Sequence, residues 1–142
     1  MIEALDNVDK TRAFNHKSLL IIDDDNPFRE RLSRAMQKKG FIVSQAESVK
    51  GAIDQVRAKK PAFVVVDLRL GDGNGLEVVK EIKNLKLNSK IVMLTGYGNI
   101  PTAVAAIKEG AIDYLAKPAD AEDVEKALLA DPSKKAAPPE NP

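Results

Sequence analysis

The chain has 142 residues, 44% of them apolar, and its 22 Lys and Arg nearly balance its 21 Asp and Glu. This composition, with only 8 Gly and 8 Pro, excludes collagen-like and wholly disordered classes and favours one compact domain with tails. The absence of Cys excludes disulfides and thiolate metal sites, and a single His leaves zinc without its usual ligands. Any bound metal should therefore be a hard cation held by oxygen atoms.

Three segments differ in their sequence pattern. Residues 1–16 are expected to be a flexible leader, residues 17–130 the folded domain, and residues 131–142, with four of the eight prolines, an extended linker. The folded segment carries 18 basic and 16 acidic residues, a nearly balanced charge that does not favour nucleic-acid binding. Because no apolar run approaches the roughly 20 residues of a membrane helix, and no signal pattern opens the chain, a soluble cytoplasmic protein without membrane contact is expected.

Five short apolar runs alternate with segments of helical periodicity. The runs are, in chain order, 18–22, 41–43, 62–66, 90–94 and 111–115. Unbroken runs rich in β-branched residues are typical of parallel strands covered on both faces. The alternation predicts an α/β fold, a doubly wound five-stranded parallel sheet with five helices.

The segments between and after the runs carry helix signals. Asn26 is placed to cap the first helix, and Gly40 to end it with a positive φ. Apolar stripes at helical spacing predict the buried faces, which are Phe28, Leu32, Ala35 and Met36; Val49, Ile53 and Val56; Leu76, Val79 and Ile82; Val104 and Ile107; and Val124 and Leu128. Acidic residues at 120, 122 and 123 suit the N-terminus of the last helix.

In sheets of this type, ligands bind beyond the carboxyl ends of the strands. The polar residues at those ends are Asp23, Asp24 and Asp25 after the first run, Asp67 after the third, Thr95 after the fourth, and Lys117 after the fifth. If the first and third strands are neighbours, the acids gather in one cleft. Carboxylates about 4 Å apart repel by roughly 4 kcal/mol per pair at an effective dielectric of 20, so the cluster requires a cation. Mg²⁺, which prefers carboxylates, carbonyls and phosphate oxygens, is the obvious candidate.

A carboxylate beside Mg²⁺, a lysine and a threonine is suited to accept a phosphoryl group. Taken singly, each residue has an ordinary explanation, because Asp and Thr at strand ends cap turns and Lys is usually solvated. Caps alone do not predict three successive acids together with a lysine after the fifth strand. The glycines of residues 71–75 lack the full dinucleotide-binding spacing and are predicted to permit tight turning beside Asp67.

Four motifs resemble those of response-regulator receiver domains of two-component signalling. They are LLIIDDD, VVVDLRLGDGNGLEVV, IVMLTGYG and GAIDYLAKPAD, and the resemblance covers residues 18–130. Within that family, LRLGDGNGL, VMLTGYGNIPTAVAAIKEGA and PPENP are similar to the RegA/PrrA/ActR group of redox-responsive bacterial transcription regulators. The resemblance implies a flavodoxin-like fold with strand order 2-1-3-4-5. It also implies a signalling role rather than an enzymatic one, apart from phosphotransfer and self-dephosphorylation.

The resemblance also assigns roles by position. It implies a phosphoacceptor at Asp67 and a Mg²⁺ site formed by Asp23, Asp24, Asp67 and the Arg69 carbonyl. It further implies phosphoryl contacts from Thr95 and Lys117, switch residues at Thr95 and the aromatic Tyr114, and a cis Lys117–Pro118 bond. Phosphate would come from a cognate sensor histidine kinase. Phosphorylation would change the conformation of the face formed by the fourth helix, fifth strand and fifth helix, through which such domains often pair as homodimers. DNA contact is expected only through an output domain beyond residues 131–142.

Two other hypotheses remain open from the residues alone. A small haloacid-dehalogenase-like phosphatase would use Asp23 and Asp25 as its nucleophile and acid, but it leaves Asp67 unexplained and lacks an acidic pair after the fourth strand. A pseudo-receiver that only binds partners would not need the full set of acids and lysine. The site of phosphorylation separates these alternatives.

Overall fold

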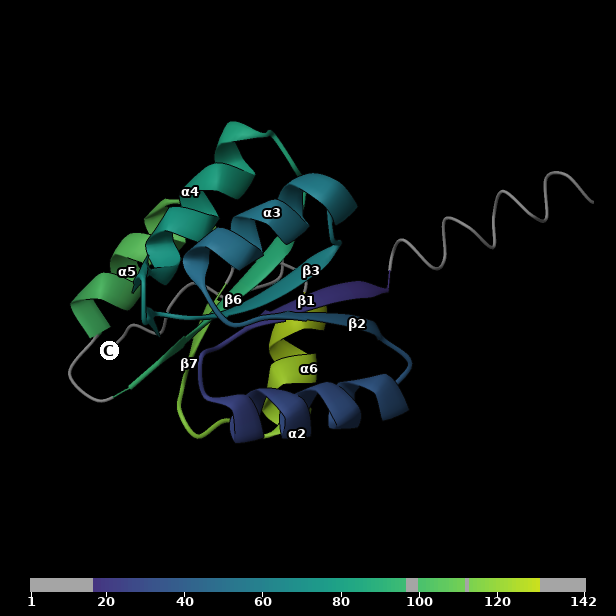
Figure 1. Ribbon diagram of the computed structural model, residues 1–142. Helices are drawn as coiled ribbons and strands as arrows, with labels where there is room; N and C mark the ends of the chain where they lie inside the picture. The colour runs from purple at the N-terminus through teal and green to yellow at the C-terminus, as the bar shows by residue number, and fades with distance from the viewer. Residues whose placement is uncertain (1–16, 97–99, 112, 131–142) are drawn as a thin grey trace, which may run out of the picture.

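The computed structural model describes residues 17–96, 100–111 and 113–130 (Figure 1). The predicted leader and linker lie outside the described residues. The elements, in chain order, are β1 (Ser18–Ile22), α2 (Asn26–Lys38), β2 (Ile42–Ala46), α3 (Val49–Lys59), β3 (Phe63–Asp67), β4 (Arg69–Leu70), β5 (Gly73–Asn74), α4 (Gly75–Asn84), β6 (Lys90–Thr95), α5 (Ile100–Lys108), β7 (Asp113–Ala116) and α6 (Ala121–Leu129).

The central sheet has five parallel strands in the order β2-β1-β3-β6-β7. This confirms the predicted order 2-1-3-4-5, since β6 and β7 are the fourth and fifth predicted strands. β1 and β3 are neighbours, with Ile22 paired to Val66 and Asp67 paired to Leu94 of β6. The residues that follow β1, β3 and β6 therefore leave the sheet at one edge.

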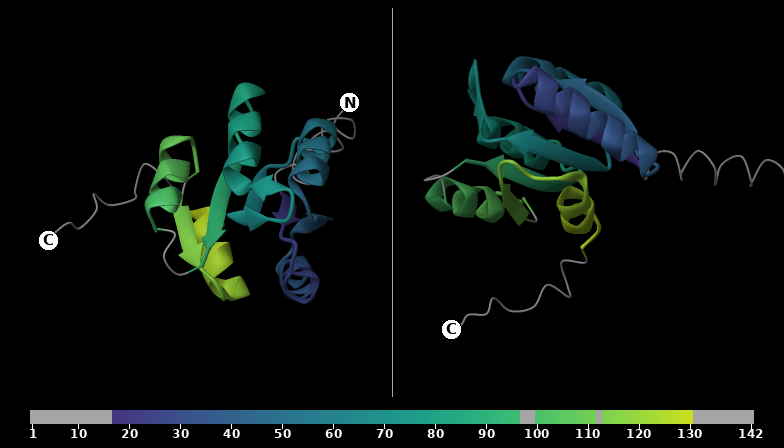
Figure 2. Two further views of the ribbon diagram at one scale, coloured as in Figure 1. Left: turned by 60° about the vertical axis from the view of Figure 1, so that its left-hand side comes forward. Right: turned by 90° about the horizontal axis from the view of Figure 1, so that it is seen from below.

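Helices cover both faces of the sheet, with α2 and α6 on one side and α3, α4 and α5 on the other (Figure 1). Figure 2 shows these layers from two further directions. Successive residues of each strand face opposite layers, because side chains alternate along a strand. In β3, Val64 and Val66 pack beneath α3 and α4, whereas Val65 packs on the side of α2 and α6. This two-sided burial is the reason for the unbroken apolar runs.

Two helix predictions are wrong in detail. The side chain that caps α2 belongs to Asp25, which accepts a hydrogen bond from the Phe28 amide at 3.1 Å, while Asn26 is already the first helical residue. On α5, Val104 and Ile107 are 42% and 38% exposed, whereas Ala106 is fully buried. Among the described side chains of this helix, the small Ala106 therefore packs in the core and the larger apolar residues face outward.

The glycine-rich segment after β3 forms a short antiparallel hairpin of β4 and β5, where the glycines predict only a tight turn. Gly75, the first residue of α4, lies directly against the backbone of Asp67, so a Cβ at this position would overlap the Asp67 carbonyl. The glycine is thus required by close approach, and it lets the hairpin fold back beside the end of β3.

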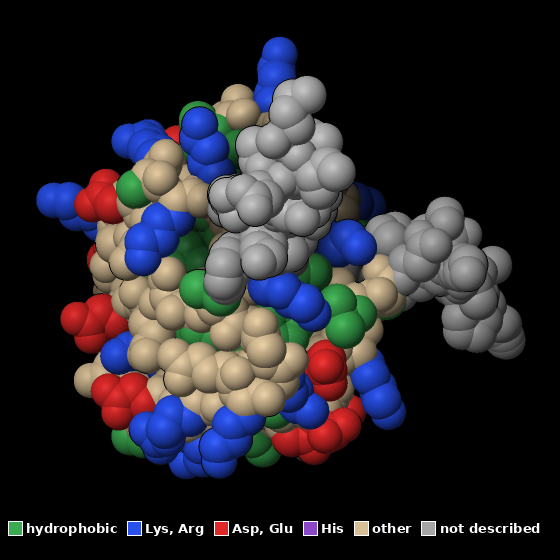
Figure 3. Space-filling view, turned by 90° about the vertical axis from the view of Figure 1, so that its right-hand side faces the viewer, with side chains coloured by type: hydrophobic (Ala, Val, Ile, Leu, Met, Phe, Trp, Pro, Cys, Tyr) green, Lys and Arg blue, Asp and Glu red, His purple; other side chains and the backbone are tan. Residues whose placement is uncertain are grey.

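Basic residues gather where the helices end. Each of the five helices in the described ranges has Lys or Arg in its last turn, at the edge where the strands begin. Figure 3 shows many Lys and Arg side chains on the side from which the chain enters β1. Cations are favoured at helix C-termini, so this distribution stabilises the helices. Among the described residues, no helix has the length and apolar character that crossing a membrane requires.

Candidate functional site

Three carboxylates meet at the carboxyl edge of the sheet. Asp23 and Asp24 follow β1, Asp67 ends β3, and each offers an oxygen atom within 4.8 Å of the others. Asp23 is fully buried and Asp67 is 8% exposed, whereas Asp24 is exposed to solvent. The neighbouring strands β1 and β3 deliver these residues to one place, as the sequence predicts. Asp25, one residue further along the chain, is not part of the group.

Lys117, which follows β7, bridges two of the three carboxylates. Its Nζ donates to Asp23 Oδ2 at 2.9 Å and to Asp67 Oδ2 at 3.2 Å. The same ammonium lies 4.8 Å from the centre of the Phe28 ring, close enough for a cation–π contact. Burial alone would lower the pKa of Lys117, but its hydrogen bond to Asp23 and the attraction of both carboxylates raise it. The lysine therefore stays charged at neutral pH. The Lys117–Pro118 peptide bond is cis, as expected.

Asp67 is held in an unfavourable electrostatic environment. Burial and the negative charge of Asp23 raise the pKa of Asp67 to about 6, although Lys117 and the Arg69 amide oppose the shift. One ammonium does not balance three clustered carboxylates. A titratable group with a strongly shifted pKa, near a specific partner, is typical of functional sites.

The loop that carries Asp23 is fixed by hydrogen bonds that the sequence analysis missed. Arg29 on α2 donates to the Asp23 carbonyl at 2.8 Å, to Asn26 Oδ1 at 2.6 Å and to Gln45 Oε1 at 2.8 Å. The Asp25 amide in turn donates to Asp23 Oδ1 at 2.9 Å. The spacing of Asn26 and Arg29, one helical turn apart, is a signal that sequence reasoning had available. These contacts orient the Asp23 carboxylate toward Lys117 and Asp67.

The remaining predicted site residues lie near this edge, with contacts of their own. Thr95 ends β6 and is 1% exposed, and its hydroxyl donates to the Gly96 carbonyl at 3.2 Å. Tyr114 on β7 is half-buried against the core beneath α3, α4 and α5. The Arg69 amide lies 3.4 Å from Asp67 Oδ1, and the Arg69 side chain is exposed. The Lys117 amide donates to the Thr95 carbonyl at 2.8 Å, while the Lys117 ammonium donates to Asp23 and Asp67.

The donor set fits a hard divalent cation. Three carboxylates offer oxygen atoms within a few ångströms of one another, and no nitrogen or sulfur ligand of the kind that transition metals prefer is among them. Asp24 is open to solvent, which leaves room for the water molecules that Mg²⁺ retains.

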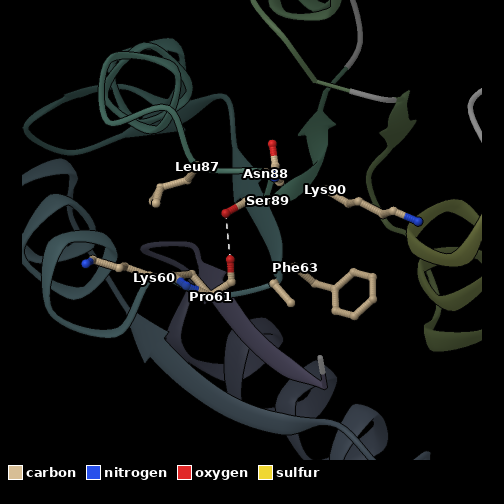
Figure 4. A pocket seen from close by; sticks show the side chains of 8 residues that line it. Lys60, Pro61, Phe63, Leu87, Asn88, Ser89 and Lys90 are labelled. Atoms are coloured by element: carbon tan, nitrogen blue, oxygen red, sulfur yellow. Dashed lines mark hydrogen bonds between the residues drawn. The ribbon is translucent and has the colours of Figure 1, made fainter. Parts of the chain in front are cut away.

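A separate cavity of about 450 Å³ lies at the opposite edge of the sheet, where β3 and β6 begin (Figure 4). It is bordered by Lys60 and Lys90, and Ser89 Oγ donates across it to the Pro61 carbonyl at 2.6 Å. No acidic residue lines this cavity, so it offers no carboxylate to a cation. The carboxylate cluster, rather than this cavity, is the candidate site.

Comparison with known proteins finds similar sequences over most of the chain. A family model described as the response regulator receiver domain matches residues 19–129. The acid tolerance regulatory protein ActR of Sinorhizobium medicae is 53% identical over 126 residues, covering 89% of this chain and 65% of ActR. The photosynthetic apparatus regulatory protein RegA of Rhodovulum sulfidophilum is 56% identical over 125 residues, covering 88% of this chain and 68% of RegA. The chain thus spans about two thirds of the length of these relatives.

One similar solved structure contains a phosphorylated aspartic acid and a metal ion. The crystal structure of a response regulator from Burkholderia pseudomallei, with a phosphorylated aspartic acid, a calcium ion and citrate, is 40% identical. It superposes with a TM-score of 0.76 over 82% of this chain and 69% of that one. The comparisons give no support to the haloacid-dehalogenase-like alternative built on Asp23 and Asp25.

Proposed function

The chain belongs to the response regulator receiver family of two-component signalling, and from that premise we propose that Asp67 is its phosphoacceptor. The observation that carries the proposal is the placement of Asp67, whose carboxylate lies within 4.8 Å of Asp23 and Asp24 and 3.2 Å from the Lys117 ammonium. Asp67 also has its pKa raised to about 6, the mark of a carboxylate whose charge is poorly compensated.

In the proposed reaction, an Asp67 oxygen forms a bond to phosphorus as the bond from phosphorus to the donor breaks. Asp23, Asp24 and the Arg69 carbonyl would hold Mg²⁺, which supplies positive charge to the carboxylates and the phosphoryl oxygens. Lys117 stays within hydrogen-bonding reach of the new phosphoryl group, and the contacts of Arg29 keep Asp23 in place. Membership of the receiver family supports a sensor kinase's phosphohistidine as the donor. The chain's one His, at position 16, lies outside the described residues.

The proposed output is a change on the face formed by α5, β7 and α6. Phosphate at Asp67 would draw the Thr95 hydroxyl away from the Gly96 carbonyl, and Tyr114 would turn into the space released. Val104 and Ile107 on α5 and Leu129 on α6 are already exposed, which supports homodimer formation through this face. A 34% identical relative named the transcriptional regulatory protein FixJ, of Rhizobium meliloti, supports a role in transcriptional control. In this proposal the domain acts within a longer protein, and an output region of that protein binds DNA.

Incubation with acetyl phosphate and Mg²⁺ tests the phosphoacceptor. The intact mass of the chain should rise by about 80 Da, one phosphoryl group, and this gain should be absent in Asp67→Asn and in the presence of EDTA. Asp25→Asn is the control, because Asn also caps helices and Asp25 lies outside the carboxylate cluster. Equal labelling of Asp67→Asn and the natural sequence would refute the assignment.

Asp24→Asn tests the metal ligands separately from phosphate. We expect the affinity for Mg²⁺, measured by titration calorimetry, to fall about tenfold or more, because one anionic ligand is lost. Asp25→Asn removes the same charge one residue along the chain and should leave the affinity within about twofold. Equal affinities of Asp24→Asn and Asp25→Asn would remove Asp24 from the metal site.

A further inference from the structure

A second carboxylate contact ties the hairpin after Asp67 to a different helix. Asp72, at the turn between β4 and β5, accepts hydrogen bonds from two backbone amides at the start of α3. Its Oδ1 is 2.7 Å from the Val49 amide nitrogen and its Oδ2 is 3.1 Å from that of Lys50. These bonds join residues 23 and 22 positions apart in the sequence. They therefore link two loops at the carboxyl edge of the sheet.

Asp72 completes the N-terminus of α3. The first amides of a helix have no partner within it. On α3, the Ser48 hydroxyl accepts from the Gly51 amide at 2.9 Å, and the Asp72 carboxylate takes the Val49 and Lys50 amides. These two amide bonds lower the pKa of Asp72, so its carboxylate is charged near neutral pH, where the helix dipole also favours it. Ser48 caps its own helix, whereas Asp72 reaches it from the hairpin.

The same hairpin forms one wall of the carboxylate cluster. Arg69 opens it, and the Arg69 amide lies 3.4 Å from Asp67 Oδ1. Gly71, next to Asp72, faces Asp24, since a Cβ there would lie 3.8 Å from Asp24 Oδ2. At its other end the hairpin continues into α4, where Asn74 and Glu77 form a capping box. The turn that touches Asp24 is thus held at its tip by Asp72.

We propose that Asp72 is a positioning residue, which clamps the β4–β5 hairpin to α3 and thereby holds Arg69 and Gly71 beside the metal-binding carboxylates. The inference rests on the proposed function, in which this cluster binds Mg²⁺. Releasing the clamp lowers the fraction of molecules with the hairpin in the binding-competent position, and the apparent affinity for Mg²⁺ falls by that fraction. Because coupling is reciprocal, Mg²⁺ in turn strengthens the contact between Asp72 and α3.

Mg²⁺ titration of Asp72→Ala tests the clamp, and Ser48→Ala is its matched control. Both variants remove a cap from the same end of α3, but only Asp72→Ala frees the hairpin. We expect Asp72→Ala to weaken Mg²⁺ binding about fivefold, on the scale of one lost cap, and Ser48→Ala to bind within about twofold of the natural sequence. The Mg²⁺ affinity of Asp72→Asn, which keeps one acceptor oxygen, should lie between the affinities of Asp72→Ala and Ser48→Ala.

Glu47→Gln controls for charge alone, because Glu47 is exposed and immediately precedes Ser48 at the same edge. Amide spectra of the metal-free protein give a readout independent of metal binding. The amide resonances of Val49 and Lys50 should shift in Asp72→Ala. In the natural sequence, Mg²⁺ should slow the hydrogen exchange of these two amides. Failure of the natural sequence to bind Mg²⁺ would overturn the proposed function itself. Normal binding by Asp72→Ala, or equal weakening in Ser48→Ala or Glu47→Gln, would overturn the clamp alone.

Discussion

Lys117→Met should reduce the initial rate of phosphorylation by acetyl phosphate about 100-fold, at saturating Mg²⁺. The lysine ammonium contacts Asp67 directly, and removal of one such charge from a preorganised site costs on this scale. Methionine keeps much of the apolar length of the lysine side chain, so the loss reports the charge, including its contact with the Phe28 ring, rather than the packing. The rate of mass gain at fixed phosphodonor concentration is the measurement.

Lys39→Met is the control for Lys117→Met. Lys39 forms ion pairs with Glu122 and Glu125 on α6 at 2.9 and 3.1 Å. Its replacement therefore removes a lysine from an ion-pair network that includes none of the carboxylates of the site. Surface pairs of this kind contribute little to stability, and phosphorylation should proceed at an unchanged rate. If Lys117→Met were phosphorylated as fast as Lys39→Met, Lys117 would be only a structural partner of Asp23.

Asp67→Asn should stabilise the metal-free protein at neutral pH by about 2 kcal/mol. The folded state raises the pKa of Asp67 from 3.8 to about 6. Between these values the folded protein binds more protons than the unfolded chain, so the free energy of unfolding falls as the pH rises. Two pKa units correspond to roughly 3 kcal/mol, and solvent screening at the partly exposed Asp67 side chain reduces this value. Asparagine removes the charge and keeps the shape.

Urea unfolding in EDTA, at about pH 4 and about pH 7, measures this effect. The stabilisation by Asp67→Asn should be near zero at the lower pH and full at the higher one, and Mg²⁺ should stabilise the natural sequence more than the variant. Asp54→Asn, on the exposed side of α3, should change stability by less than about 0.5 kcal/mol at either pH. A neutral-pH stability of Asp67→Asn equal to or below that of the natural sequence would contradict the electrostatic account.

The position of the site could be predicted because it depends on the sheet alone. Apolar runs fixed where the strands end, and parallel strands bring those ends to one edge. This was sufficient to place Asp23, Asp67 and Lys117 together. Burial on both faces also explains why apolar and polar residues do not alternate within the apolar runs, since β3 is buried along its whole length.

Finer features depended on contacts that sequence patterns do not encode. Asp25 and Asn26 are adjacent and both suit a helix cap, so only the path of the chain decides between them. On α5, Ala106 is buried in the core while the larger Val104 and Ile107 are exposed, a rotation of the helix that the apolar stripe alone does not predict. The bonds of Asp72 to α3 join loops that meet only after the sheet has formed.

Peptide mapping after brief exposure to acetyl phosphate and Mg²⁺ tests the central claim most directly. Trypsin separates the rival acceptors, because the peptide of residues 60–69 contains Asp67 as its only acid, whereas the peptide of residues 18–29 contains Asp23, Asp24 and Asp25. We expect the additional mass of about 80 Da on the peptide of residues 60–69. Its appearance on the peptide of residues 18–29, with residues 60–69 unmodified, would contradict Asp67 as the phosphoacceptor.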